Sequence, residues 1–182
     1  MSDTTTIEHV AVLGAGTMGN GIAQVCAAAG MTVAVSDVSD DALAKGRAAV
    51  EASLGRMVAK AKLTAEARDA TLARITWVRS LADAVCQADL VVEAIPERIA
   101  LKLETFRAVD AAAPKHALLG TNTSSLSVTE IAGAVADPTR VVGLHFFNPV
   151  PVMELLEIVR GLRTPDASVE RAKSFAARIG KT

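Results

Sequence analysis

A histidine, an asparagine and a glutamate in the C-terminal part of the sequence have the types and spacing for proton transfer. His145 and Asn148 lie at the end of the apolar run in GLHFFNP, and Glu157 lies in the next apolar run. An imidazole can take the hydroxyl proton of an alcohol as hydride leaves, and a carboxylate on its other nitrogen fixes the tautomer and stabilises the imidazolium. Glu154 is an alternative partner. The other interpretation is that His145 only makes hydrogen bonds within a turn and that Glu157 is a surface carboxylate.

Polar side chains also follow an earlier apolar run. The segment NTSS, with Asn122 and Ser124, comes at the end of a predicted strand, as His145 does. The carboxyl ends of parallel strands line the ligand crevice in open α/β sheets. Hydroxyl and amide groups of this segment therefore have the position to hold a substrate oxygen.

A glycine-rich hexad near the start of the chain, GAGTMG, indicates a phosphate site. It contains Gly14, Gly16, Thr17, Met18 and Gly19, follows an apolar run directly and opens an amphipathic one. Gly14 can form the turn, Gly16 can let backbone N–H groups approach a pyrophosphate, and Gly19 can allow close helix packing. The helix N-terminus then faces the phosphates with its partial positive charge.

Asp37 is a second, separately placed indication of a dinucleotide. It ends the second predicted strand, where its carboxylate can accept hydrogen bonds from the adenosine ribose hydroxyls. A 2′-phosphate would lie against Asp37, with Asp40 and Asp41 close behind and no arginine nearby to neutralise it. Because like-charge contacts are strongly unfavourable, the sequence predicts NAD rather than NADP. The alternative is that the glycines serve only a turn and Asp37 only caps a helix.

The elements that position these residues are short strands alternating with alanine-rich helices, the pattern of βαβ units. Strands are expected at 9–13, 31–36, 75–78, 90–95, 117–122, 140–147 and 155–160, and helices at 17–29, 81–87, 99–112, 128–135 and 167–179. The stretch from Asp40 to Arg74 is too long for an ordinary crossover and is expected to form two helices broken near Leu63 and Thr64. The predicted fold class is α/β, a Rossmann-like doubly wound, mostly parallel sheet with an inserted helical hairpin, in a single domain over residues 1–182.

Composition excludes several function classes. The 182 residues are 51% hydrophobic and 21% charged, with a net charge of −1 and 3% aromatic residues. These values argue against a disordered tail, a charge-driven nucleic-acid binder or a base-stacking surface. Cys26 and Cys86 lack metal-ligand spacing, and neither a signal peptide nor a spanning apolar stretch is found. We therefore expect a cytoplasmic protein without a metal, a nucleic-acid partner or a membrane partner.

Four segments together resemble a known family. They are GAGTMGNGIAQV, VVEAIPE, NTSSLSVTEIA and GLHFFNPVPVMELLEIV, of which the last is far more specific than the glycine hexad. In these segments the sequence resembles the NAD-binding domain of the L-3-hydroxyacyl-CoA dehydrogenases, a group that includes the 3-hydroxybutyryl-CoA dehydrogenases. The resemblance extends from about Ile7 to Thr182.

The resemblance implies roles for individual catalytic residues. His145 matches the family's general base and Glu157 its partner, which demotes Glu154 to a neighbour. Ser124 matches the serine that contacts the substrate oxygen near the nicotinamide. Asn148 matches an asparagine that supports the same site.

The resemblance also implies contacts with the two nucleotide-containing ligands. On the cofactor side, Asp37 matches the ribose ligand, and Glu97 and Lys102 match a glutamate and a lysine that contact NAD. Asn122 is placed with these residues as predicted to bind the cofactor.

Ser53 and Lys60, in the predicted hairpin, match residues that contact the coenzyme A moiety. Lys62 competes with Lys60 for this role, and a solvated helix face is the alternative for both lysines.

The implied activity is an NAD-dependent oxidoreductase that interconverts (S)-3-hydroxyacyl-CoA and 3-oxoacyl-CoA. The alternative is a non-catalytic NAD-binding sensor or scaffold, which would need no proton acceptor at the position of His145. Family members continue past the position of Thr182 into a mainly helical domain that closes the acyl pocket and forms most of the dimer contact. That domain is absent from this sequence, so we expect the cofactor-binding half of an enzyme whose full-length form is a homo-oligomer.

Overall fold

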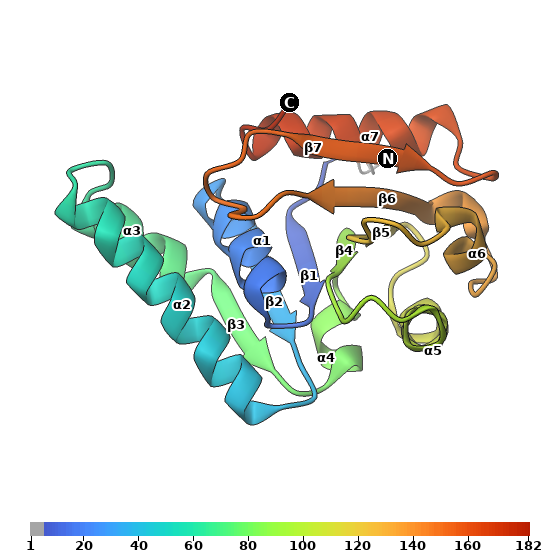
Figure 1. Ribbon diagram of the computed structural model, residues 1–182, viewed down its shortest axis with the longest axis horizontal. Coiled ribbons are helices and arrows are strands. Elements are labelled where there is room, and N and C mark those ends of the chain that lie inside the picture. Colours follow the sequence, from blue (N-terminus) through green and yellow to red (C-terminus); the bar gives the residue numbers. More distant parts are fainter. Residues whose placement is uncertain (1–5) are drawn as a thin grey trace.

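Short, β-branched apolar runs form the strands of one seven-stranded sheet, ordered β3-β2-β1-β4-β5-β6-β7 (Figure 1). The computed structural model describes residues 6–182. The strands are β1 (His9–Leu13), β2 (Thr32–Ser36), β3 (Ile75–Val78), β4 (Leu90–Glu93), β5 (Leu118–Thr121), β6 (Val141–Phe146) and β7 (Leu156–Arg160). Neighbouring strands are parallel except for β7, which is antiparallel to β6.

Helices cover both faces of this sheet. They are α1 (Thr17–Ala28), α2 (Asp40–Ala59), α3 (Ala65–Ala73), α4 (Leu81–Val85), α5 (Ile99–Ala112), α6 (Val128–Ala132) and α7 (Asp166–Arg178), with a 3-10 turn at Pro138–Arg140. Each face of the sheet has its own hydrophobic core, and alternate residues of β1 point into one or the other. Val10 and Val12 belong to the core packed by α1, α2 and α7. Ala11 and Leu13 belong to the core packed by α4, α5 and α6. A sheet buried on both faces explains why its strands are almost wholly apolar.

The predicted fold class is confirmed, and most predicted boundaries are correct within two residues. The strand expected to reach Ile95 ends at Glu93 instead. The carboxylate of Glu93 accepts a hydrogen bond from the backbone N–H of Ile95 at 2.8 Å, which turns the chain out of the sheet. The side chain of Glu93 therefore marks the end of β4.

The inserted hairpin is formed by α2 and α3, and it lies beside β3 at one end of the sheet (Figure 1). Its two helices begin with side-chain caps, since Ser39 accepts from the N–H of Ala42 and Thr64 accepts from the N–H of Ala67. A Cβ on Gly46 would lie 2.6 Å from the carbonyl oxygen of Ala15, so α2 packs closely against the loop that precedes α1.

The last two residues are bonded to the segment that leads into β7. Nζ of Lys181 donates to the carbonyl oxygens of Val150 and Met153 at 2.8 and 2.7 Å. Thr182 exchanges backbone hydrogen bonds with Glu154 and Leu156, both at 2.9 Å. These bonds fix the connection between β6 and β7.

Among residues 6–182, no helix combines the length and the apolar character needed to cross a membrane.

Candidate active site

The glycine-rich loop between β1 and α1 forms the first part of the site. Gly14 has a φ of +100°, which residues with a side chain rarely adopt, and its N–H donates to the carbonyl oxygen of Ser36 at 2.7 Å. A Cβ on Gly19 would lie 1.7 Å from the carbonyl oxygen of Gly14. The turn expected at Gly14 and the close packing expected at Gly19 are therefore confirmed.

Gly16 has a different environment from the other two glycines. A Cβ at this position would find no protein atom within 4 Å. Helix α1 begins at Thr17 without a side-chain cap and without an acidic residue in its first turn. Because the first N–H groups of a helix lack intrahelical partners and attract anions, the open space at Gly16 fits a pyrophosphate.

Asp37 follows β2 and is fixed against the same loop. Its two carboxylate oxygens accept hydrogen bonds from the backbone N–H groups of Ala15 and Ser39, at 2.9 and 3.0 Å. A cavity of about 570 Å³ opens beside it. Five of the predicted cofactor residues line this first cavity, namely Gly14, Gly16, Thr17, Met18 and Asp37.

An arginine also lines the first cavity, which corrects the expectation that none is near Asp37. Arg79 follows β3, and its guanidinium donates to Asp40 at 2.9 Å and to the carbonyl oxygen of Val38 at 2.6 Å. The parallel pairing of β2 with β3 places their carboxyl ends side by side, which sequence distance does not reveal. Since Asp40 pairs with Arg79, the negative charge of Asp37 still disfavours a 2′-phosphate.

His145 and Glu157 face one another across β6 and β7. They are register partners in the antiparallel pair, and Nδ1 of His145 lies 2.7 Å from Oε2 of Glu157. A carboxylate at Nδ1 places the ring proton there and leaves Nε2 as the acceptor. Of the two candidate partners, Glu157 therefore pairs with His145, whereas Glu154 precedes β7 and bonds through its backbone to Thr182.

A second cavity, of about 350 Å³, is lined by three of the four residues predicted for catalysis, all but Glu157, and by three of the residues predicted to bind the cofactor. It is lined by Glu97, Asn122, Ser124, His145 and Asn148, among others. Met18, Ala94 and Ile95 line both cavities, so the two adjoin. Together they form one crevice from Asp37 to His145 at the carboxyl ends of the strands, where open α/β sheets bind ligands.

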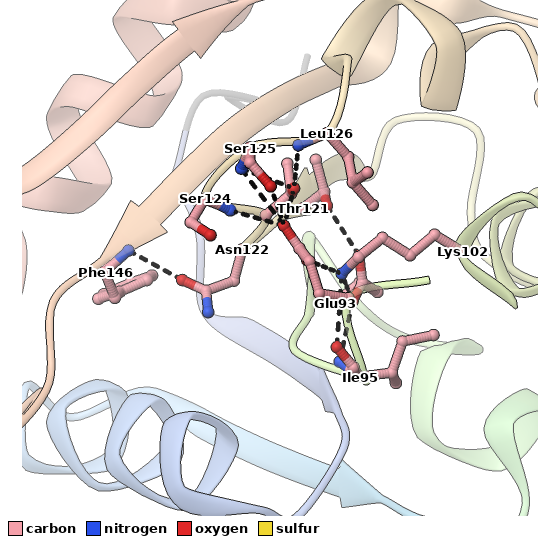
Figure 2. Close-up of polar contacts among 11 residues, drawn as sticks. Glu93, Ile95, Lys102, Thr121, Asn122, Ser124, Ser125, Leu126 and Phe146 are labelled. Carbon is pink, nitrogen blue, oxygen red and sulfur yellow. Dashed lines mark hydrogen bonds and ion pairs between the residues drawn. The ribbon is translucent and has the colours of Figure 1, made fainter. Parts of the chain in front are cut away.

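Asn122 connects β5 to β6 at the edge of the second cavity. Its Oδ1 accepts the backbone N–H of Phe146 at 2.8 Å (Figure 2). The amide oxygen is thus used within the fold, which leaves the NH₂ group as the donor for a ligand.

Glu97 holds the loop that follows β5. Its Oε1 accepts hydrogen bonds from Thr123 Oγ1 at 2.5 Å and from the backbone N–H groups of Ser124 and Ser125 at 3.0 and 3.3 Å. Partial burial acts to raise the pKa of Glu97, but the hydrogen bond from Thr123 and the charge of Lys102 outweigh it and lower the pKa to about 2. Glu97 is therefore ionised at neutral pH in the wall of the second cavity.

Behind Glu97 lies a buried ion pair that the sequence analysis missed. The side chains of Lys102 and Glu93 are 1% and 0% exposed, and Nζ of Lys102 lies 2.6 Å from Glu93 Oε1 (Figure 2). Lys102 Nζ also lies 3.2 Å from Glu97 Oε2. The lysine expected to contact the cofactor faces two carboxylates and lines neither cavity. The signal for Glu93 was a charged residue ending the apolar run in VVEAI.

The family model for the NAD-binding domain of 3-hydroxyacyl-CoA dehydrogenase matches residues 9–182. The chain belongs to this family. It is 43% identical over 175 residues to a 3-hydroxybutyryl-CoA dehydrogenase from Bradyrhizobium diazoefficiens and 44% identical over 175 residues to a 3-hydroxyadipyl-CoA dehydrogenase from Escherichia coli. These matches cover 96% of this chain but 59% and 37% of the two relatives, so the chain spans only part of their length.

Solved structures agree with this assignment of the NAD-binding domain. The 3-hydroxybutyryl-CoA dehydrogenase from Escherichia coli superimposes with a TM-score of 0.95 at 44% identity, over 97% of this chain and 37% of that one. The (S)-3-hydroxybutyryl-CoA dehydrogenase from Ralstonia eutropha gives a TM-score of 0.93 at 41% identity, over 97% of this chain and 62% of that one. The family resemblance and NAD as the cofactor are thereby confirmed.

The residues of this NAD-binding domain fit the cofactor. The open position at Gly16 and the uncapped start of α1 suit a pyrophosphate, and Asp37 lies where ribose hydroxyls would meet it. Ser53 and Lys60 lie on α2 and at its C-terminal end, outside both cavities, and Lys62 is exposed like Lys60. Their contact with coenzyme A stays a prediction.

Proposed function

We propose that this domain is the cofactor-binding half of an enzyme that interconverts (S)-3-hydroxyacyl-CoA and 3-oxoacyl-CoA. The observation that supports this proposal is the His145–Glu157 pair, with 2.7 Å between Nδ1 and Oε2, in a cavity that adjoins the dinucleotide cavity. A domain that only bound NAD would have no use for a proton acceptor in that place. The sensor or scaffold alternative is therefore not favoured.

His145 is the general base of the proposed oxidation. Its Nε2 takes the proton of the substrate's 3-hydroxyl group, and the carboxylate of Glu157 stabilises the imidazolium that forms. In the reductive direction the same nitrogen returns the proton to the oxygen. Bound NAD supplies the hydride acceptor or donor for the carbon that bears this oxygen.

Ser124 and Asn148 hold the reacting oxygen in this proposal. Both are exposed and both line the second cavity with His145. A hydroxyl and an amide can donate to a carbonyl oxygen as negative charge develops on it. The backbone of Ser124 is itself held by Glu97, at 3.0 Å, so its position depends on that carboxylate.

The proposal also covers the substrate contacts, the oligomeric state and the cellular location of the protein. The acyl-CoA thioester would reach the second cavity, with Ser53 and Lys60 as its contacts on the hairpin. Residues 1–182 would act as one domain, in a homo-oligomer that forms when the rest of the enzyme is present, and in the cytoplasm, where free thiols such as Cys26 and Cys86 persist.

The test is reduction of acetoacetyl-CoA with NADH, followed at the NADH absorbance. The chain is assayed alone and after fusion to the part of the Bradyrhizobium relative that it does not match. Hydride transfer needs exact geometry and exclusion of water, so we expect NADH binding but little turnover from the chain alone, and turnover from the fusion.

Two outcomes would contradict the proposal. A fusion that binds NADH but does not reduce acetoacetyl-CoA or a longer 3-oxoacyl-CoA would remove the assigned substrate class. Full activity of the 182 residues alone would show that the chain is not half of an enzyme.

A further inference from the structure

We propose that Glu93 is a positioning residue for the nicotinamide end of the crevice. It acts through Lys102 and Glu97 on the loop from Asn122 to Ser125, which lines the second cavity. The inference rests on the NAD-binding assignment, and only its consequence for turnover rests on the proposed dehydrogenase function.

The first step from Glu93 to the loop is the set of contacts made by the ammonium group of Lys102. Its ammonium has three hydrogens and three acceptors close by, namely Glu93 Oε1 at 2.6 Å, Glu97 Oε2 at 3.2 Å and the carbonyl oxygen of Ile95 at 3.4 Å. Its side chain is 1% exposed. Lys102 therefore has protein acceptors for all three of its hydrogens, and it joins the carboxylates of Glu93 and Glu97.

The second step is that the two carboxylate oxygens of Glu97 contact different partners. Oε2 faces Lys102, while Oε1 accepts from Thr123 and from the backbone N–H groups of Ser124 and Ser125. The side chain of Glu97 is 36% exposed, so burial does not restrict its rotamers and its position depends on its polar contacts. The buried ammonium fixes this carboxylate, and the carboxylate fixes the loop.

Glu93 holds the same loop from its other end. Its Oε2 accepts from Thr121 Oγ1 at 2.7 Å, at the last residue of β5, and its Oε1 accepts from the N–H of Ile95 at 2.8 Å. Figure 2 shows these contacts converging on Glu93 from β5, from the turn after β4 and from Lys102. Glu93 is 0% exposed and lines neither cavity, so it can affect a ligand only through these partners.

A buried ion pair is weak evidence for stability, because desolvation offsets much of the attraction between the charges. An apolar pair would serve the core as well. An apolar pair, however, would not orient the carboxylate of Glu97. The contacts of Glu93 and Lys102 therefore indicate a positioning role rather than a stabilising one.

The experiment compares two ligands on the 182-residue chain. NADH carries both an adenosine and a nicotinamide, whereas ADP-ribose lacks the nicotinamide. E93Q keeps the size of the side chain and removes its charge, so we expect affinity for NADH to fall about tenfold and affinity for ADP-ribose to change less than about twofold. Loss of a partner that orients a binding group has effects of about this size at metal sites.

D110N is the matched control. Asp110 lies on α5, as Lys102 does, and its side chain is 15% exposed. Its carboxylate accepts a hydrogen bond from the backbone N–H of Ala136 at 2.9 Å and lies 3.7 Å from Arg140. Asp110 lines neither cavity. The substitution should lower the melting temperature without changing either affinity. Unchanged NADH affinity in E93Q, or an equal loss for NADH and ADP-ribose, would overturn the proposal.

A double variant separates position from stability even where E93Q folds poorly. E93Q/K102M removes the buried charges, so the melting temperature should return toward that of the parent chain. Glu97 still loses its buried partner, so NADH affinity should stay low. Recovery of NADH affinity together with the melting temperature would show that Glu93 is only structural. Because these readouts involve no acyl-CoA, they stand or fail independently of acetoacetyl-CoA turnover.

Discussion

The two ends of the crevice are built differently. Beside Asp37, where we propose that the adenosine binds, the glycine loop presents backbone groups. Beside His145, where we propose that the nicotinamide binds, side chains from several loops form the surface. The first end consists of the glycine loop, the start of α1 and Asp37, whose carboxylate is fixed by two backbone N–H groups. The second end consists of His145, Glu157 and the loop held by Glu97.

This difference determines which change damages which property. A backbone surface is altered by adding atoms to it, and the glycine loop, the start of α1 and Asp37 all lie in the β1-α1-β2 unit or directly after it. A surface of side chains is altered by removing charge or hydrogen bonds, and its residues come from β4, β5, β6 and β7. We therefore expect added atoms to do the most damage at the glycine loop, and the loss of side-chain groups to do the most damage at the second end.

The largest effect is expected at His145. In the fusion protein, H145A should lower the rate of acetoacetyl-CoA reduction by about 10²- to 10⁴-fold, because the proton acceptor is lost. Affinity for NADH should stay near the parent value, since Nε2 is not needed to bind the dinucleotide. Steady-state rates and NADH fluorescence titration measure the two quantities. Retained turnover would exclude His145 from the mechanism.

The next largest effects separate two glycines of one loop. In G19A the new Cβ would meet the backbone oxygen of Gly14 at 1.7 Å, so we expect destabilisation of about 3 kcal/mol or more in urea unfolding. In G16A the new Cβ would meet no protein atom, so the unfolding free energy should not change.

The same G16A variant should bind NADH about tenfold more weakly, or about 1.4 kcal/mol, because the methyl group takes the space of the pyrophosphate. A G16A chain that binds NADH normally would move the pyrophosphate away from this loop.

The two ends also differ in how far sequence could predict them. The strands, the turn at Gly14 and the position of Asp37 follow from local pattern, because each depends on residues near in sequence. Local pattern left the partner of His145 open between Glu154 and Glu157. The family resemblance favoured Glu157, and the register of β6 and β7 places Glu157 opposite His145.

Arg79 and the Glu93–Lys102 pair show the same limit more strongly. Arg79 reaches the cavity of Asp37 only because β2 pairs with β3. The family resemblance predicted that Lys102 contacts NAD together with Glu97, yet Lys102 is buried against Glu93, which lies nine residues earlier at the end of β4. Such contacts depend on tertiary packing, which no local pattern contains.

An effect about as large as that of G16A on binding is expected for cofactor choice. D37S should raise affinity for NADPH relative to NADH by about tenfold, since it removes the charge that opposes a 2′-phosphate. D37S/D40S should shift the ratio further, because Arg79 loses its 2.9 Å partner and is free to meet the phosphate.

The matched control for this shift is D37S/D41S, which removes the same charge but breaks only the contact of Asp41 with Lys45. Equal NADPH-to-NADH ratios in the two double variants would show that Arg79 has no part in the choice.

The smallest effect is a pH dependence at Glu97. Its pKa is lowered in the folded protein from 4.5 to about 2, so its stabilising contribution is fully present above about pH 4.5 and is lost as pH falls toward 2. The difference in unfolding free energy between the parent chain and E97Q should therefore be constant near neutral pH and shrink below about pH 4.5. Urea unfolding at a series of pH values measures it, and a difference independent of pH would contradict the assigned cause.

The bonds of Lys181 and Thr182 have a mechanical consequence. The backbone N–H of Leu156 donates to Thr182 at 2.9 Å, and the next residue, Glu157, pairs with His145. Force applied at Thr182 would thus reach the proton acceptor through one hydrogen bond, one peptide link and one side-chain contact, without passing through the parallel sheet. Loss of the bond at Thr182 should therefore be seen first as faster amide exchange at Leu156.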